Sequence, residues 1–301
     1  MEIKEKYSYS KLACFEQCPY KYKLIYVDGH FISCPSIATD FGTLIHHIEE
    51  EIGKYLQAGL KPDYKLLIAD FESQIKKIEK DYPDEFYSLD KSGRSYKEKA
   101  DYYKSSGIYR LENRLTQNSN LEIVGLEKEF YLDFNEYLFH GFIDRVFYDS
   151  STDTYIIEDI KTYAQPIANK DLEAPLQHVI YSLALKGSID KDTKIQCTYD
   201  LPLCNLIQEV DPQYLQKGIL ELQEIFEDIK YSEFEPKPTP LCHWCLFSGT
   251  YPNQPDEAKG LCPYFSKWTK ENKTMRCNYY WQGSKKHQKI LESFRKDLDL
   301  D

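Results

Sequence analysis

Apolar residues along the chain recur first at the spacing of helices. Residues 8–27 and 41–59 carry large apolar side chains three and four positions apart, and both segments predict helices. Residues 63–118 carry charged side chains at the same spacing, with breaks at Pro83 and Gly93. We expect these residues to form a helical subdomain or a lid.

The pattern then changes to the alternation of strands. The expected elements are strands at residues 121–134, 137–149 and 154–163, a helix at 171–187, a strand at 193–203 and a helix at 211–231. Asp211 is placed to cap the last helix, with Pro212 at its first position. This order of elements predicts an α/β core with a helical elaboration.

The same pattern divides the chain into three parts of one compact unit. Residues 1–120 form an N-terminal helical region, residues 121–235 the core, and residues 236–301 a cysteine-rich segment with a basic helical tail. The stretch SEFEPKPTP, at residues 232–240, predicts an extended linker before the cysteines.

Composition and charge narrow the class of protein. Of the 301 residues, 42% are hydrophobic and 29% are charged, which is typical of a soluble globular chain. The chain has no run of 18 apolar residues, and its N-terminus lacks the apolar core of a signal peptide, so we expect a cytoplasmic protein. The net charge of −11 disfavours a protein that coats nucleic acid, but not an enzyme that gathers its cations in one cleft.

Residues 155–163, YIIEDIKTY, place charge inside an apolar strand. Asp159 and Lys161 are two residues apart and therefore share a face of the strand. Asp144 interrupts the preceding strand in the same way, so the two carboxylates approach each other if the strands pair. A divalent cation would relieve their repulsion, with the backbone carbonyl of Ile160 as a further ligand. For a single D-x-K sequence, a surface salt bridge is the commoner explanation.

The nine cysteines favour metal binding or burial over a disulfide framework. Their number is odd, the chain is long, and the expected compartment is reducing. The sequence CHWC at residues 242–245 provides a C-x-x-C pair that can hold one metal. Cys34, Cys197 and Cys204 are expected to be buried or loop thiols.

Four short motifs follow one another along the chain. They are G-x-x-x-H at Gly42 and His46, an aspartate at Asp144, D-x-K at Asp159 and Lys161, and Q-x-x-x-Y at Gln177 and Tyr181. With the N-terminal sequence SYSKLACFEQCPYKYK, they resemble the PD-(D/E)XK nuclease superfamily over roughly residues 7–265. The resemblance is to the RecB-like and AddB-like branch, which includes CRISPR-adaptation exonucleases with an iron–sulfur cluster. It implies an α/β restriction-endonuclease-like core, a central mixed sheet flanked by helices, with an N-terminal helical subdomain and a C-terminal cysteine-rich cluster segment.

The resemblance implies metal-dependent hydrolysis of DNA phosphodiesters. The implied metal ligands are His46, Asp144, Asp159 and the backbone carbonyl of Ile160, which would hold Mg²⁺ or Mn²⁺. The implied catalytic residues are Asp144, Asp159, Lys161, Gln177 and Tyr181. Lys161 would position the attacking water and offset the charge that builds on the phosphate. Gln177 and Tyr181 share one helix face and would meet the catalytic strands and the DNA, and Glu129 is a further candidate for the site.

The cysteines imply a second metal site. In this branch one early and three late cysteines hold a [4Fe–4S] cluster, and the corresponding residues are Cys18, Cys242, Cys245 and Cys262. Sixteen residues separate Cys245 from Cys262, more than the family usually has. The residues that could replace the fourth ligand are Cys14, His243 and Cys277. Zinc is the alternative metal, and we expect a structural role for either.

The resemblance favours an exonuclease that acts on single-stranded DNA or duplex ends, in the repair or recombination of a bacterium, an archaeon or a phage. The sequence has no G-x-x-x-x-G-K-[ST] loop, so a helicase would be a separate partner. The basic residues that could follow a DNA backbone are Lys11, Lys21, Lys23 and Arg110. A non-catalytic DNA-binding or adaptor protein is the alternative, although the intact motif residues argue against it. An electron-transfer protein would leave those motifs unexplained.

Overall fold

The chain forms two compact units. One consists of Met1–Tyr9 and Pro35–Leu222, and the other of Ser10–Cys34 and Gln223–Asp301. The computed structural model describes residues 5–90, 92–173, 175–190, 192–211, 213–237, 242, 245–248 and 255–262. The first unit contains the D-x-K motif and its neighbours, and the second contains the cysteines of the expected cluster.

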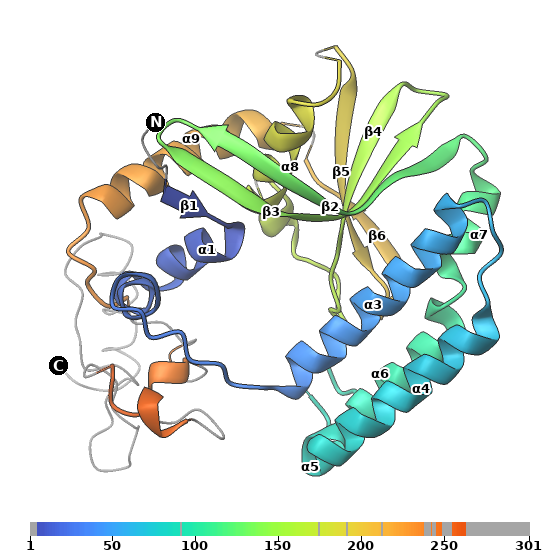
Figure 1. Cartoon of the computed structure of the whole chain (residues 1–301), viewed down its shortest axis with the longest axis horizontal. Coiled ribbons are helices and arrows are strands. Elements are labelled where there is room, and N and C mark those ends of the chain that lie inside the picture. Colours follow the sequence, from blue (N-terminus) through green and yellow to red (C-terminus); the bar gives the residue numbers. More distant parts are fainter. Residues whose placement is uncertain are drawn as a thin grey trace. The chain divides into compact units, whose positions relative to one another are not determined.

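A six-stranded mixed sheet forms the centre of the first unit (Figure 1). Its strands are β1 (Glu5–Tyr7), β2 (Leu121–Phe134), β3 (Tyr137–Asp149), β4 (Thr154–Ile160), β5 (Lys194–Leu201) and β6 (Leu206–Glu209). Their order is β1-β3-β4-β5-β6, with β2 also paired to β3. The pairs β1–β3 and β4–β5 are parallel, and the other pairs are antiparallel.

Strand β3 is the strand on which the site is assembled. One of its edges pairs with β2 along nearly its whole length. The other edge pairs with β1 at residues 137–139 and with β4 at residues 145–149. Among the described strands, none pairs with residues 140–144 on that second edge, and Asp144 lies at the end of this interval. The side chain of Asp144 therefore borders a gap in the ladder.

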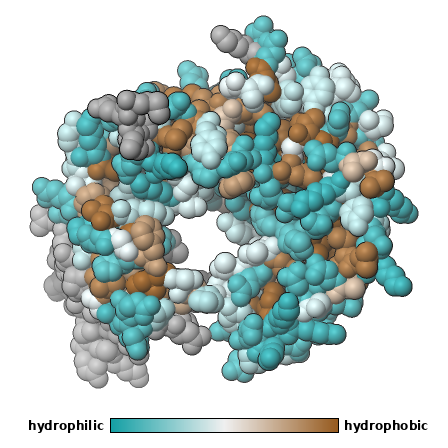
Figure 2. Space-filling view, in the orientation of Figure 1, coloured by the Kyte–Doolittle hydropathy of each residue, from teal (hydrophilic) through white to brown (hydrophobic). Residues whose placement is uncertain are grey.

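Helices that precede β2 cover one face of the sheet (Figure 1). They are α3 (Ile37–Gln57), α4 (Tyr64–Asp81), α5 (Pro83–Tyr87), α6 (Tyr96–Tyr102), the π-helical turn η2 (Tyr103–Gly107) and α7 (Arg110–Gln117). Helix α3 begins earlier than predicted because the hydroxyl of Ser36 accepts the N–H of Thr39 and caps it. Its buried stripe packs on Phe71 of α4 and on Phe147 of β3 within one core. The visible surface of α4 and its neighbours is predominantly hydrophilic (Figure 2).

Helix α8 (Leu176–Lys186) lies on the other face, after the 3-10 turn η3 (Asn169–Leu172). It packs on β2 and β4, and the ring of its His178 meets Tyr199 of β5 edge-on at 4.4 Å. Helix α9 (Tyr214–Lys230) lies so close to α8 that a side chain at Gly218 would collide with Val179. Helices thus flank both faces of a mixed sheet, which confirms the predicted fold class.

The second unit contains a broken N-terminal helix. The helix predicted over residues 8–27 is divided into α1 (Tyr9–Gln17), α2 (Pro19–Tyr22) and the π-helical turn η1 (Lys23–Val27). The break falls at Cys18, whose backbone is extended and precedes Pro19. Tyr22 stacks on Phe234, with ring centroids 6.0 Å apart, and so ties this segment to the later part of the chain.

Four further differences from the sequence prediction are two strands that it missed and two element ends that it placed differently. Strands β1 and β6 were not predicted, because three and four residues carry too little alternation to stand out. Strand β4 ends at Ile160, and α8 begins only after Pro175. Within the described ranges, no helix is long and apolar enough to cross a membrane.

A cluster of buried charges joins the sheet to α3 and α7. Its members are Glu49, Arg110, Arg114, Arg145, Glu158 and Asp200, hereafter the charge cluster. Arg145 of β3 donates to Glu49 of α3 and to Glu158 of β4, both at 2.9 Å. Arg110 pairs with Glu49 and Asp200, and Arg114 pairs with Glu158. Burial alone would raise the pKa of Glu49, but the charges of Arg110 and Arg145 hold it below its usual value.

Removing Arg145 should therefore strongly destabilise the fold. In Arg145→Met, the fully buried carboxylates of Glu49 and Glu158 lose their shared partner. We expect the free energy of unfolding to fall by about 3–5 kcal/mol, measured by urea denaturation. Lys54→Met, which removes exposed helix pairs to Glu50 and Glu51, should cost less than about 1 kcal/mol. Equal urea midpoints for Arg145→Met and the wild type would contradict this account.

Candidate metal centre

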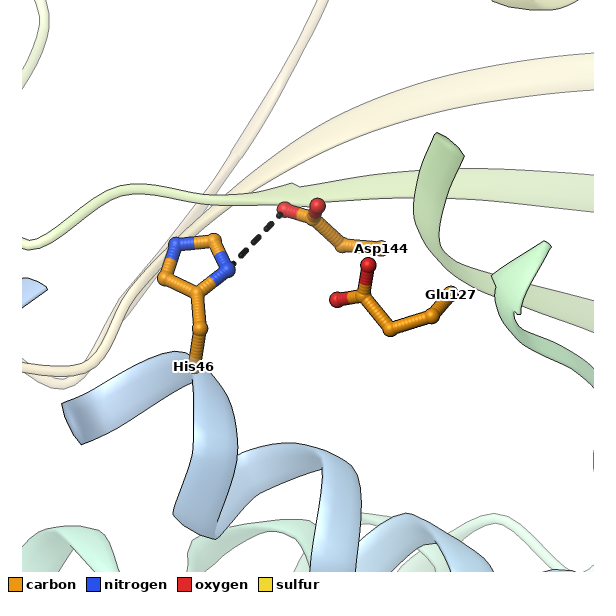
Figure 3. A group of neighbouring side chains, drawn as sticks. All are labelled: His46, Glu127 and Asp144. Carbon is orange, nitrogen blue, oxygen red and sulfur yellow. Dashed lines mark ion pairs between the residues drawn. The ribbon is translucent and has the colours of Figure 1, made fainter. Parts of the chain in front are cut away.

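Three donor groups from three different elements converge beside residues 140–144 of β3, where none of the described strands pairs with the edge opposite β2. His46 comes from α3, Glu127 from β2 and Asp144 from β3 (Figure 3). Each offers one donor atom, and these atoms lie within 4.8 Å of one another. His46 Nδ1 is 3.8 Å from Asp144 Oδ2. One imidazole nitrogen and two carboxylates form a donor set that Mg²⁺ and Mn²⁺ accept.

An irregularity in β2 places Glu127 in this group. The register between β2 and β3 shifts between Ile123 and Gly125. Beyond the shift, Leu126 pairs with Arg145 and Lys128 with Ile143, so Glu127 stands opposite Asp144. The φ angle of Glu127 is 40°, in the left-handed region that residues other than glycine rarely adopt. The strained backbone thus turns this carboxylate toward Asp144.

The carboxylate of Asp144 is held by the neighbouring strand. Its Oδ2 accepts the backbone N–H of Ile160 at 2.7 Å, just beyond the last residue pair between β3 and β4. Burial, followed by the charge of Asp159, raises the pKa of Asp144 to about 7. Burial and the charge of Asp144 raise the pKa of Glu127 as well. Two crowded carboxylates with raised pKa values are the environment that a bound cation stabilises, so these residues fit a divalent metal.

His46 is suited to bind a metal in its neutral form. Burial lowers its pKa, although the charges of Asp159 and Glu127 act in the opposite direction. A hydrogen bond between the ring and the backbone of Ile160 also acts to raise the pKa of His46. This part of β4 therefore lies beside the imidazole. A neutral imidazole offers a lone pair to a cation without first releasing a proton.

A chain of hydrogen bonds fixes the motif lysine. Lys161 Nζ lies 2.7 Å from Asp159 Oδ2 and donates to Gln177 Oε1 at 3.1 Å. Gln177 Nε2 in turn donates to the hydroxyl of Tyr181 at 2.7 Å. Burial alone would lower the pKa of Lys161, but the charge and hydrogen bond of Asp159 raise it. The ammonium group is therefore charged and held in one orientation by β4 and α8.

The predicted residues thus form two adjoining sets. His46 and Asp144 meet in the metal group, while Asp159, Lys161, Gln177 and Tyr181 form the hydrogen-bonded chain. The bond from Ile160 to Asp144 joins the two sets. Asp159 is not among the three donors within 4.8 Å, so its role as a metal ligand stays a prediction, as does that of the Ile160 carbonyl.

Glu129 is not part of the site. It is exposed, and its carboxylate pairs with His140 at 2.8 Å and accepts the hydroxyl of Tyr131. In the observed register Glu129 pairs with Phe142, whereas Glu127 stands opposite Asp144, so Glu127 is the glutamate of β2 that joins the metal group. The buried residues of β2 have odd numbers up to Gly125, but the next buried residue is Phe130, so the alternation changes between these two positions.

Arg110 does not serve as a DNA-tracking residue, because it lies buried in the charge cluster. Among the other expected basic residues, Lys23 pairs with Asp28 and Lys21 donates to Gln17. Lys11 lies over the rings of Tyr22 and Tyr26, at 5.8 and 5.5 Å from their centroids. The spacing of charged residues along 63–118 does not show which face of α7 meets the sheet.

The cysteines expected to bind the cluster all belong to the second unit. Cys18 caps α2, and its sulfur accepts the backbone N–H of Lys237 at 3.4 Å. Cys245 and Cys262 pack on the small apolar core around Leu24 and Phe247. Burial raises the pKa of Cys245, and the nearby sulfurs of Cys18 and Cys242 act in the same direction. The four residues named from the family pattern are therefore gathered in one part of the fold.

Cys14 stays a competing ligand. Burial raises its pKa to about 11, and the nearby sulfurs of Cys18 and Cys245 act in the same direction. His243 and Cys277 lie outside the described residues. Cys197 is buried against Tyr214 and Ser182, in keeping with a plain core thiol.

The sequence and this geometry agree with one protein family. The family model of the PD-(D/E)XK nuclease superfamily matches residues 6–250, and the chain belongs to that superfamily. Nucleases of this superfamily use divalent metals, and the group of His46, Glu127 and Asp144 fits that requirement. Among curated proteins, none matches the sequence. A solved structure titled "Crystal structure of SSO0001" matches with a TM-score of 0.28 and 16% identity, over 79% of this chain and 95% of that chain.

The two glutamates of β2 provide a direct test of the metal centre. Glu127→Gln should weaken the binding of Mn²⁺ at least about tenfold, because it removes one of three donor carboxylate or imidazole groups. Glu129→Gln, two residues away and exposed, should bind Mn²⁺ as the wild type does. Isothermal titration calorimetry measures both affinities. A larger loss for Glu129→Gln than for Glu127→Gln would overturn the assignment.

Proposed function

We infer that the protein is a metal-dependent DNA exonuclease of the RecB-like and AddB-like branch, acting on single-stranded DNA or duplex ends. The observation that carries this proposal is the meeting of two sets of residues at one point of the sheet. The metal group of His46, Glu127 and Asp144 adjoins the chain from Asp159 through Lys161 to Gln177. Metal donors beside a fixed cation are what hydrolysis of a phosphodiester requires.

Each residue has a defined task in this proposal. His46, Glu127 and Asp144 would hold Mg²⁺ or Mn²⁺, with Asp159 and the Ile160 carbonyl as further candidate ligands. Bound there, the cation polarises a phosphate oxygen and makes water more acidic. Lys161, oriented by Gln177, donates hydrogen bonds to the attacking water and offsets the charge that develops on the phosphate. Tyr181 holds Gln177 in place.

We further propose that the second unit carries a structural [4Fe–4S] cluster on Cys18, Cys242, Cys245 and Cys262. All four lie in the same compact unit, although Cys18 is far from the others in sequence. Cys245 and Cys262 are partly buried and pack on the apolar core around Phe247. Thiolates in such surroundings suit an iron–sulfur cluster, with zinc as the alternative. The cluster would link the N-terminal helices to the C-terminal segment.

Removing the motif lysine should abolish cleavage while leaving metal binding intact. Lys161→Ala should lower the rate of DNA hydrolysis about 100-fold to 1,000-fold, because the developing charge loses its fixed counter-charge. The assay follows single-stranded and duplex DNA, labelled at the 5′ or the 3′ end, with Mn²⁺, Mg²⁺ or EDTA. Lys54→Ala, an exposed lysine of α3, is the matched control and should cleave as the wild type does.

The products of the same assay decide between the candidate activities. Progressive shortening from one labelled end supports an exonuclease, and internal fragments of closed circular DNA contradict it. If the folded wild type retains DNA and metal binding but does not hydrolyse any of these substrates, the proposed activity is wrong.

The proposed cluster predicts about four iron atoms per chain in protein purified without oxygen. Cys245→Ala should lose most of this iron and the visible absorbance that accompanies it. Cys34→Ala, which changes a cysteine outside the proposed set, should retain both. Zinc in place of iron in the wild type, measured by elemental analysis, would show that the cluster assignment is wrong.

A further inference from the structure

A cavity of about 640 Å³ opens directly beside the motif lysine. Lys161 and Gln177 form part of its wall, and every residue that lines it belongs to the first unit. Its volume lies within the range of about 300–1,000 Å³ that is usual for sites of small organic groups. The roles of Lys161 and Gln177 in the hydrolysis do not require a cavity of this size, so it has room for another part of the substrate.

Three tyrosines give this cavity flat walls. They are Tyr9, Tyr163 and Tyr199. Tyr199 is almost fully buried and is held by its edge-on contact with His178, so its ring is a fixed surface. Tyr163 follows Lys161 by two residues, and 54% of its surface is exposed. An exposed ring at the rim of a cavity can stack on an incoming planar group.

The charges around the cavity argue against a phosphate inside it. Asp171, Glu173 and Glu221 contribute three carboxylates, whereas Lys161 and Lys170 contribute two ammonium groups. Carboxylates repel a phosphate but accept hydrogen bonds from the exocyclic amino groups of nucleobases. The walls therefore suit an uncharged planar ring with amino groups.

We propose that this cavity binds one unpaired nucleobase of the DNA strand, next to the phosphate that is hydrolysed. The proposal rests on the proposed function, because the position of Lys161 beside the phosphate defines which base reaches the cavity. A base within a duplex presents its amino groups to its partner and is stacked on both sides, so it must leave the helix to enter. The cavity thus selects single-stranded ends, with Tyr163 as the stacking residue.

The test moves one abasic site along a labelled single-stranded oligonucleotide. With the wild type and Mn²⁺, kcat/KM should fall at one position next to the cleaved bond and change little elsewhere. The expected loss is about 5-fold to 150-fold, the range for stacking of one base on an aromatic side chain. Tyr163→Ala should show a similar loss on the intact oligonucleotide and no further loss when the abasic site occupies that position.

Two variants control for effects of the tyrosine other than stacking. Tyr163→Phe keeps the ring and should retain the loss of kcat/KM at the same abasic position. Tyr87→Ala removes a tyrosine that is equally exposed, at 54%, and does not line the cavity, so it should retain the positional effect of the abasic site. An abasic effect that is uniform along the strand, or one that persists in Tyr163→Ala, would overturn the proposal.

A binding measurement separates this inference from the proposed activity. An oligonucleotide with a single 2-aminopurine is bound in EDTA, where cleavage does not occur, and its fluorescence reports stacking of that base. Quenching in the wild type that is lost in Tyr163→Ala supports the cavity even if the protein hydrolyses no DNA. Active cleavage combined with equal fluorescence in both proteins would refute the cavity and leave the nuclease assignment in place.

Discussion

The ion pairs of Arg145 are the interaction on which the architecture of the site depends. A guanidinium with 1% of its side chain exposed reaches Glu49 on α3 and Glu158 on β4, with Asp200 of β5 3.7 Å away. Charges buried this deeply are tolerated only when every partner is in place. Three residues of the charge cluster are also close in sequence to residues of the site. Arg145 follows Asp144, Glu158 precedes Asp159, and Glu49 lies one helical turn after His46. Pairing within the charge cluster therefore fixes the spacing of the groups that face the proposed metal and phosphate.

The sequence predicted those parts of the site that depend on local periodicity. The two-residue spacing of Asp159 and Lys161 predicted a shared strand face, and the two side chains form an ion pair. The four-residue spacing of Gln177 and Tyr181 predicted a shared helix face, and these side chains are hydrogen-bonded. Family resemblance added His46 and Asp144, whose meeting depends on contacts across more than ninety residues of chain. The order of helices and strands also gave the correct fold class. These features follow from short patterns that a single sequence carries.

Other parts depend on tertiary structure that no local pattern encodes. The register of β2 against β3 places Glu127, and not the expected Glu129, opposite Asp144, and a single strand sequence does not show which residues of its partner it faces. Arg110 was expected among the basic residues that could follow a DNA backbone, yet two buried carboxylates hold it in the charge cluster. The cavity beside Lys161 collects residues from Tyr9 at the start of α1 to Glu221 of α9, and only the folded chain brings them together.

The hydrogen bond between the Ile160 N–H and Asp144 bears on ion selectivity. One carboxylate oxygen of Asp144 is already engaged by the backbone of β4. A cation that takes both oxygens of this carboxylate would have to compete with that bond, whereas a cation that needs only one would not. Ca²⁺ often takes both oxygens of a carboxylate and prefers six to eight ligands, while the smaller Mg²⁺ uses few protein ligands in strict octahedral geometry. If a cation binds at this site, the bond from Ile160 to Asp144 would favour one that needs a single oxygen of this carboxylate.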